Sequence, residues 1–189
     1  MKNLGKKIFV VAVFSLLTAA LASASEKEGK ALTAFGSLGY RLGVMDKKPV
    51  GMPGLEMGLV LWERLLLGVE TRSVLPELDR RLAGESRTLQ GGSGGLLIGI
   101  NIIKGGIFTL GFQNVSGFGG YVFRGENGIA MLHYFVDSSL FGEWEIRDHL
   151  RLGLSLGNRV SYRVKDGDGL DADMQKGPFA GLYLKLGTF

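Results

Sequence analysis

The chain of 189 residues contains no cysteine, and it has no apolar segment long enough for a membrane-spanning helix. Disulfides therefore play no part, and a lipid-anchored lipoprotein is excluded because no cysteine follows the apolar leader. The longest apolar run, residues 8–21, has about 14 residues, whereas a spanning helix needs about 20. Any insertion of this chain into a membrane must therefore use strands.

The chain also lacks a real excess of charge once its first residues are set aside. Lys2, Lys6 and Lys7 precede the apolar run, and Ala22-Ser23-Ala24 follows it with the A-x-A pattern of a cleavage site. We therefore predict a secretory signal peptide at residues 1–24 and a single mature domain at residues 25–189. Removing the leader leaves 19 basic and 18 acidic residues, so the charge gives no reason to expect a nucleic-acid partner.

What the chain does contain is strict alternation, most clearly between Leu150 and Val164. In a strand, successive side chains point to opposite faces, so this segment has one apolar face and one face of arginine, serine and glycine. It runs to about 15 residues, against about five or six in an ordinary strand and about 9 to 11 in a strand that crosses a bilayer. A closed barrel is the only sheet that leaves no unpaired backbone edge in hydrocarbon. The outward, lipid-facing set is Leu150, Leu152, Leu154, Leu156, Val160, Tyr162 and Val164.

Seven further segments alternate, at residues 32–44, 55–61, 65–73, 94–102, 129–146 and 179–189 and from residue 107 onwards. The alternation is weakest in the first half of residues 129–146, and residues 114–120 break the pattern, so the end of the segment that starts at residue 107 is not defined. Tight turns are predicted at residues 62–64, 104–106 and 147–148. Long loops are predicted at residues 46–53, after residue 73, after the fifth strand and at residues 165–176, the one after residue 73 being the longest. The predicted fold is all-β: an antiparallel up-and-down transmembrane barrel of eight strands with short periplasmic turns and longer extracellular loops.

The charged residues test this assignment independently, because only the apolar stripes were used to set the phase of each strand. An arginine or lysine on the lipid face at the bilayer midplane would cost about 2 to 4 kcal/mol. All the strand charges fall on the inward face and form a predicted lumen network: Arg41, Glu56, Glu70, Arg72, Asp137, Glu143, Glu145, Arg151, Arg159, Arg163 and Lys185. The outward aromatics Tyr40, Trp144 and Tyr162 are predicted to lie at the membrane interfaces.

With its leader, four hairpins, inward charges of both signs and terminal Phe189, the chain resembles the small eight-stranded outer-membrane barrels of the OmpA and OmpX type. The resemblance implies localisation in the cell outer membrane, contact with its lipids, and recognition of the C-terminal strand by the barrel-insertion machinery. In that family the terminal Phe usually shares a face with other apolar residues. Here Phe189 shares its phase with Lys185 and Tyr183 instead, so the insertion signal is atypical unless a bulge near Gly187 restores the phase.

The interior of an eight-stranded barrel is just wide enough for side chains to fill it. Buried charges must then neutralise one another, since an unpaired buried charge is costly. We predict that Arg151 pairs with Glu143, Glu145 or both, and that Asp137 lies within reach of Arg159. A plug of structural ion pairs is favoured over the alternative, a narrow ion or proton path.

Two further sets of residues suggest other functions. The residues His133, Ser138 and Asp137 resemble the histidine, serine and acid that lipid A acyl enzymes of the PagL and PagP kind use. His133 and Ser138 are separated by an odd number of residues, however, so in a strand they face opposite sides.

The loop at residues 165–176 has carboxylates at alternating spacing, a composition that suits calcium. It lacks the EF-hand pattern, so a solvated loop is favoured. These carboxylates are Asp166, Asp168, Asp171 and Asp173.

The sequence thus favours a non-enzymatic outer-membrane barrel, without cofactor, whose loops contact an extracellular ligand or which mainly stiffens the envelope. A lipid A acyl hydrolase or transferase and a narrow channel are the alternatives.

Overall fold

The computed structural model describes residues 32–45, 48–74, 78–82, 85–123, 131–165 and 176–188. The predicted signal peptide lies outside the described residues. Among those that are described, no helix has the length and hydropathy needed to cross a membrane.

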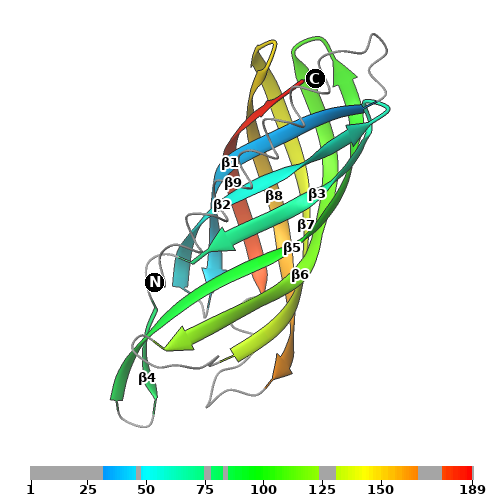
Figure 1. Ribbon diagram of the computed structural model, residues 1–189. Helices are drawn as coiled ribbons and strands as arrows, with labels where there is room; N and C mark the ends of the chain where they lie inside the picture. The colour runs from blue at the N-terminus through cyan, green and yellow to red at the C-terminus, as the bar shows by residue number, and fades with distance from the viewer. Residues whose placement is uncertain are drawn as a thin grey trace, which may run out of the picture.

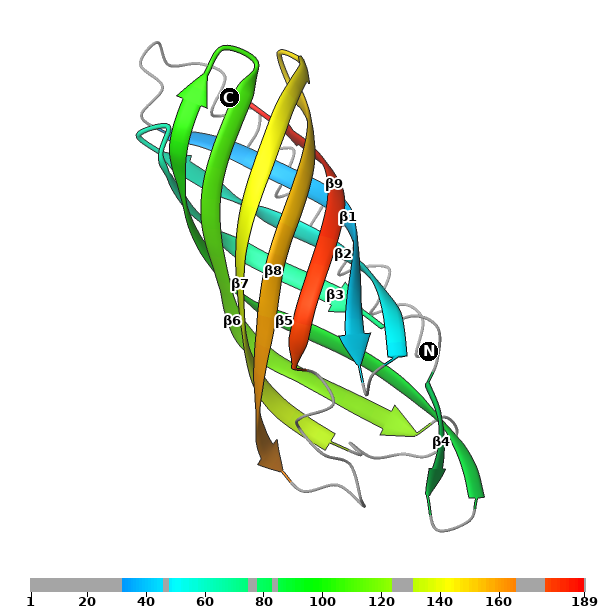
Figure 2. The ribbon, with the colours of Figure 1, turned by 180° about the vertical axis from the view of Figure 1, so that it is seen from behind.

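Nine antiparallel strands form one sheet, in the order β3-β2-β1-β9-β8-β7-β6-β5-β4, and a further pairing of β3 with β5 closes it into a barrel of eight strands (Figures 1 and 2). The ninth strand, β4, pairs only with the far end of β5. The strands are β1 (Leu32–Met45), β2 (Lys48–Leu61), β3 (Leu65–Ser73), β4 (Leu78–Leu82), β5 (Glu85–Gly105), β6 (Phe108–Phe123), β7 (Met131–Arg147), β8 (Leu150–Lys165) and β9 (Gly177–Gly187). The predicted eight-stranded barrel is confirmed.

Three tight turns join β2 to β3, β5 to β6 and β7 to β8, and they lie at one end of the barrel, which we call the turn end (Figure 1). The β2–β3 turn holds two non-glycine residues in the left-handed region, Trp62 at φ 50° and Glu63 at φ 60°. Asn101 stabilises this turn, because its side-chain amide donates to the carbonyl oxygen of Glu63 at 2.9 Å and its backbone NH donates to that of Arg64 at 2.8 Å. The opposite end, where β4 projects, is the loop end.

The predicted loop at residues 46–53 is wrong, because β2 begins at Lys48 and pairs with β1 along its whole length. Pro49 and Pro53 suggested a break, since proline has no backbone NH to donate. Both lie before Gly54, where the pairing with β3 begins. That stretch of β2 pairs with β1 alone among the described strands, and proline is tolerated along an edge that has no partner.

The predicted long loop after residue 73 contains strands that were not predicted. β4 and the start of β5 form a hairpin there, and β5 extends nine residues before the predicted start at Gly94. β6 likewise continues to Phe123, through the stretch from Asn114 to Gly120 that had no clear pattern. Both extensions are polar or rich in glycine, so they lack the apolar stripe by which the other strands were recognised.

Where their side chains are described, the eight strands of the barrel present an apolar face outward and a mixed face inward. Leu38, Leu96 and Leu156 are more than 60% exposed, although a soluble protein would bury most such side chains. The lumen is crowded, as Gly153 illustrates: a Cβ atom at this position would lie 2.1 Å from the ring of Tyr183. Inward glycine thus makes room for neighbouring large side chains, which accounts for part of the high glycine content.

Candidate functional site

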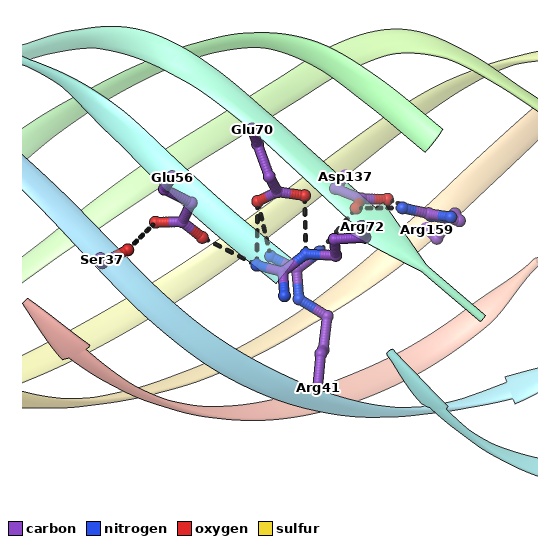
Figure 3. A network of polar contacts seen from close by, with 7 residues as sticks. All are labelled: Ser37, Arg41, Glu56, Glu70, Arg72, Asp137 and Arg159. Atoms are coloured by element: carbon purple, nitrogen blue, oxygen red, sulfur yellow. Dashed lines mark hydrogen bonds and ion pairs between the residues drawn. The ribbon is translucent and has the colours of Figure 1, made fainter. Parts of the chain in front are cut away.

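A network of charged side chains crosses the middle of the lumen, and we call it the central network (Figure 3). Its members come from five strands, and each is between 1% and 7% exposed. Three are arginines, three are carboxylates and one is a serine, so the charges balance. The members are Ser37, Arg41, Glu56, Glu70, Arg72, Asp137 and Arg159.

Two bidentate pairs form the halves of this network. On one side, Arg72 donates from Nε and Nη2 to the two oxygens of Glu70 at 2.7 and 3.0 Å, and its Nη2 also reaches Glu56 at 2.7 Å. On the other side, Arg159 donates from Nε and Nη2 to Asp137 at 2.6 and 2.7 Å. Bidentate pairing fixes both distance and orientation, so each half is well defined in geometry.

Arg41 joins the two halves. It extends from β1 and donates from Nη1 to Asp137 on β7 at 2.7 Å and from Nη2 to Glu70 on β3 at 3.1 Å. Its guanidinium carbon also lies 4.0 Å from the centre of the Phe179 ring on β9, a cation–π contact. A single side chain therefore connects four strands through the lumen.

A second group, the basal cluster, lies nearer the turn end and consists of Glu143, Glu145, Arg151, Tyr183 and Lys185. Arg151 donates to Glu143 at 3.4 Å and to Glu145 at 3.2 Å across the β7–β8 turn. Glu143 also accepts hydrogen bonds from the hydroxyl of Tyr183, at 3.0 Å, and from the ammonium of Lys185. Two acids and two bases again balance, but the side chain of Glu145 is 33% exposed.

Buried apolar side chains fill much of the remaining lumen: Phe35, Val60, Leu66, Leu97, Val115, Phe135 and Phe141. Two small cavities touch the charged groups, one beside Glu143 and Arg151 and one beside Arg159 and Phe179. Each has room for about 10 Å³, close to the space that one water molecule needs. The described lumen is therefore packed with side chains.

The three residues of the enzyme alternative do not form a catalytic group. His133 is fully buried in the lumen, where it stacks on Tyr121 at 5.9 Å between ring centres. Ser138 is only partly buried and donates to the side chain of Asn114 at 2.6 Å, on the outward face. The pairing of β6 with β7 has no bulge between residues 133 and 138, so the serine stays on the face opposite His133 and Asp137.

Two rows of aromatic side chains mark the limits of the lipid-facing band. Phe118, Tyr134 and Tyr162 are register partners on β6, β7 and β8, with ring centres 5.5 and 6.5 Å apart. Nearer the turn end, Phe108 contacts Trp144 at 5.2 Å. The predicted interfacial residues Tyr40, Trp144 and Tyr162 are all exposed. Phe108, Phe118 and Tyr134 were not predicted to be interfacial, because their places in the two rows become evident only from the register of the strands.

The spacing of these rows gives the thickness of the band. Tyr134 and Trp144 lie ten residues apart on β7, which is about 33 Å along a strand. With the usual tilt of about 35 to 45°, that length spans about 25 Å along the membrane normal, the height of the apolar band in membrane barrels. The exposed leucines between the rows therefore face lipid.

Strands on different sides of the barrel extend unequally beyond the band at the loop end. Gly94 of β5 pairs with Phe118 in the aromatic row, and β5 continues nine residues past that level, where it carries β4. On the other side, only residues 46 and 47 separate β1 from β2. Figure 1 shows the β4–β5 hairpin as the farthest projection from the barrel. The rim at the loop end is therefore tall on one side and low on the other.

Several predicted residues cannot be placed. The side chain of Arg163, the carboxylates of Asp166, Asp168, Asp171 and Asp173, and Phe189 lie outside what the structure describes. Within the described residues there is no cluster of three or more metal-ligating side chains. The ten other members of the predicted lumen network all have their side chains within the barrel, and Arg151 contacts both Glu143 and Glu145.

No protein-family model matches the chain, and no curated protein matches its sequence. Solved structures do match its fold. The Neisserial surface protein A (NspA) aligns with a TM-score of 0.59 and 9% identity over 86% of this chain and 100% of its own. The outer membrane protein OprG from Pseudomonas aeruginosa aligns with a TM-score of 0.51 and 9% identity over 83% of this chain and 95% of its own. The chain therefore has the fold of small outer-membrane β-barrels.

Proposed function

We propose that the protein is a non-enzymatic outer-membrane barrel that presents its tall rim, formed by β4 and the outer ends of β5 and β6, to an extracellular ligand. The observation that carries this proposal is the contrast between a filled lumen and a one-sided projection beyond the lipid-facing band. A packed interior with balanced ion pairs leaves little room for transport or for a bound substrate. The projecting hairpin provides a surface that a purely structural barrel does not need.

The orientation belongs to the same proposal. In outer-membrane barrels the short turns face the periplasm and the longer connections face outward. The turn end would then be periplasmic, with the chain exported by the signal peptide at residues 1–24 and inserted through the C-terminal strand that ends at Phe189. The aspartates of the loop at residues 165–176 would then lie on the outside, in contact with solvent.

The enzyme alternative has little geometric support, because Ser138 and His133 lie on opposite faces of β7. Asp137 is moreover held by two arginines, which leaves its carboxylate poorly placed to orient a histidine. Mass spectrometry of lipid A from cells with and without the protein tests this alternative directly. A change of acylation that depends on His133 would refute the non-enzymatic proposal.

Deletion of residues 79–88 tests the proposal, because it removes most of the hairpin but keeps Leu89, which pairs with β6. We expect the shortened protein to retain its heat-modifiable migration and its urea midpoint, since closing a shorter connection changes the free energy by less than about 1 kcal/mol. Binding of the nanodisc-embedded protein to an array of glycans and extracellular proteins should fall to the level of empty nanodiscs. Replacing Asp46-Lys47 by Asn-Gly on the low side is the matched control and should leave binding unchanged.

Two results would contradict the proposal: a parent protein that binds nothing on the array above empty nanodiscs, or a folded deletion variant that binds as the parent does. The stability measurement separates these outcomes from a failure to fold.

A further inference from the structure

Beside the β7–β8 turn, the outer surface of the barrel has a concavity of about 510 Å³. Half of its lining is aliphatic and half is polar or charged. In Figure 2 this turn stands at the top, next to the end of β9. The lining residues are Ile146, Arg147, Asp148, His149, Leu150 and Leu186.

The concavity lies where lipid headgroups meet the protein. Trp144, one of the aromatics that mark the band at the turn end, precedes Arg147 by three residues on β7 and pairs with Leu152 on β8. Leu150 and Leu186 are register partners that continue the lipid-facing stripe to the edge of the concavity. A molecule bound there would thus have its apolar part against the stripe and its polar part at the level just beyond the tryptophan.

A bulge in β7 places the side chain of Arg147 at this concavity. Strict alternation from Glu143 and Glu145 would turn Arg147 into the lumen as well. The pairing of β7 with β8 shifts register between Glu145 and Arg147, however, and Arg147 is exposed. Bulges often re-aim a side chain in this way. Within the described part of the chain, Arg147 forms no ion pair that would neutralise its charge.

The remaining polar groups are acceptors. Asp148 is exposed beside Arg147 and carries the opposite charge. The ring of His149 is held through Nδ1, which lies 3.3 Å from the carbonyl oxygen of Gly187, while the backbone NH of Gly187 donates to the carbonyl oxygen of His149 at 3.1 Å. Since a carbonyl can only accept, Nδ1 carries the proton, and in the neutral ring Nε2 is then an acceptor.

We propose that this concavity binds a glycerophospholipid with a zwitterionic headgroup, of the phosphatidylethanolamine type, from the leaflet that meets the turn end. Arg147 pairs with the phosphate, and Asp148 and Nε2 of His149 accept hydrogen bonds from the primary ammonium. The acyl chains lie along Ile146, Leu150 and Leu186. An anionic headgroup without an ammonium would leave Asp148 facing like charge, and a quaternary ammonium would offer no hydrogen to the two acceptors.

The test uses the full mature barrel in detergent micelles, with lipid retention measured by native mass spectrometry. The probes are phosphatidylethanolamine, phosphatidylcholine and phosphatidylglycerol with identical acyl chains, so that only the headgroup differs. We expect phosphatidylethanolamine to be retained about fivefold more than the other two, the size of one exposed charge interaction. Arg147→Gln should lower the retention of all three lipids, because all three carry the phosphate, and Asp148→Asn should remove the preference for phosphatidylethanolamine. Arg64→Gln, which alters an exposed arginine on the β2–β3 turn, is the matched control and should preserve it.

Equal retention of the three lipids, or a preference for phosphatidylglycerol, would overturn the proposal. So would a retention that Arg147→Gln leaves unchanged, a preference that survives Asp148→Asn, or a loss of either that Arg64→Gln causes to the same extent. Heat-modifiable migration of each variant verifies that it is folded, and Asp148→Asn provides a second, independent variant if Arg147→Gln does not fold. The measurement does not involve the loop end, so its result is independent of the proposed extracellular ligand.

Discussion

The central network and the basal cluster occupy the same lumen and both balance their charges, yet they are built differently. The basal cluster joins β7, β8 and β9, which are neighbours in the sheet, and its acids lie within eight residues of Arg151. The central network joins strands that are not neighbours. Arg41 on β1 reaches Asp137 on β7, 96 residues away in sequence. Every member of the central network is at most 7% exposed, whereas the side chain of Glu145 in the basal cluster is 33% exposed.

This contrast indicates that the basal cluster stabilises contacts between neighbouring strands, whereas the central network stabilises the closed barrel. Contacts across one turn form as soon as the β7–β8 hairpin forms, because the turn itself holds the partners close. Contacts among β1, β3, β7 and β8 require the closed barrel, so the central network stabilises closure. Breaking the central network should therefore cost more than breaking the basal cluster.

The largest effect is expected for Arg72→Leu, which leaves Glu56 with Ser37 as its hydrogen-bond partner in the central network. A buried carboxylate that loses its cation typically destabilises a protein by about 3 to 5 kcal/mol. The measurement is the free energy of unfolding in urea, for the barrel refolded in lipid vesicles. Adding Glu56→Gln should restore more than half of the loss, because the uncompensated negative charge is then removed. An Arg72→Leu variant as stable as the parent would show that Arg72 and Glu56 do not form an ion pair in the lumen.

A smaller effect is expected for Arg151→Leu in the basal cluster. Glu143 keeps Lys185 and Tyr183 as partners, and Glu145, which loses its cation, is partly exposed to solvent. We expect a loss of about 1 to 2 kcal/mol, less than for a fully buried pair. The same urea titration applies, and Glu145→Gln should recover most of the loss. If Arg151→Leu cost as much as Arg72→Leu, the difference in burial between Glu56 and Glu145 would not determine the stability that each group contributes.

The smallest effects are expected when a single hydroxyl is removed from each group. Ser37→Ala removes the hydrogen bond to Glu56, at 3.2 Å, and Tyr183→Phe removes the one to Glu143. Each should cost about 1 kcal/mol, the net value of one hydrogen bond. Similar values would indicate that the two groups differ in how their charges are connected. A much larger loss for Ser37→Ala would contradict this interpretation, because Ser37 and Tyr183 are 6% and 7% exposed and are therefore equally buried. Lys104→Met, at an exposed ion pair with Glu63, is the surface control and should change stability by less than about 1 kcal/mol.

The basal cluster and the central network also differ in how far the sequence predicts them. Alternation set the phase of β7 and β8, and the tight turn set their register, so the contacts of Arg151 with both acids follow from local pattern. The same reasoning predicted that Asp137 reaches Arg159 on the adjacent strand. The role of Arg41 could not be predicted, because it depends on which strands face each other across the closed barrel.

The parts of the fold that alternation missed are those that do not face lipid. β4 and the first residues of β5 lie beyond the aromatic row, where no apolar stripe is required, and a pattern of polar residues and glycine was interpreted as a loop. The prolines of β2 misled for a different reason, since a proline excludes a strand only where its missing NH would have had a partner. Most strands of the barrel could therefore be predicted from the apolar stripe that lipid contact requires. The strands of the rim have no such stripe and were not predicted.

The most direct test of the account is the conductance of the purified barrel in a planar lipid bilayer, because the central claim is that side chains close the lumen. We predict no current steps above the bare bilayer for the parent protein, since the central network and the apolar side chains around it leave cavities of about one water molecule. Heat-modifiable migration of the same sample verifies that the barrel is folded. Reproducible ohmic steps from the folded parent would contradict the account, and they would identify the lumen as the functional site in place of the rim.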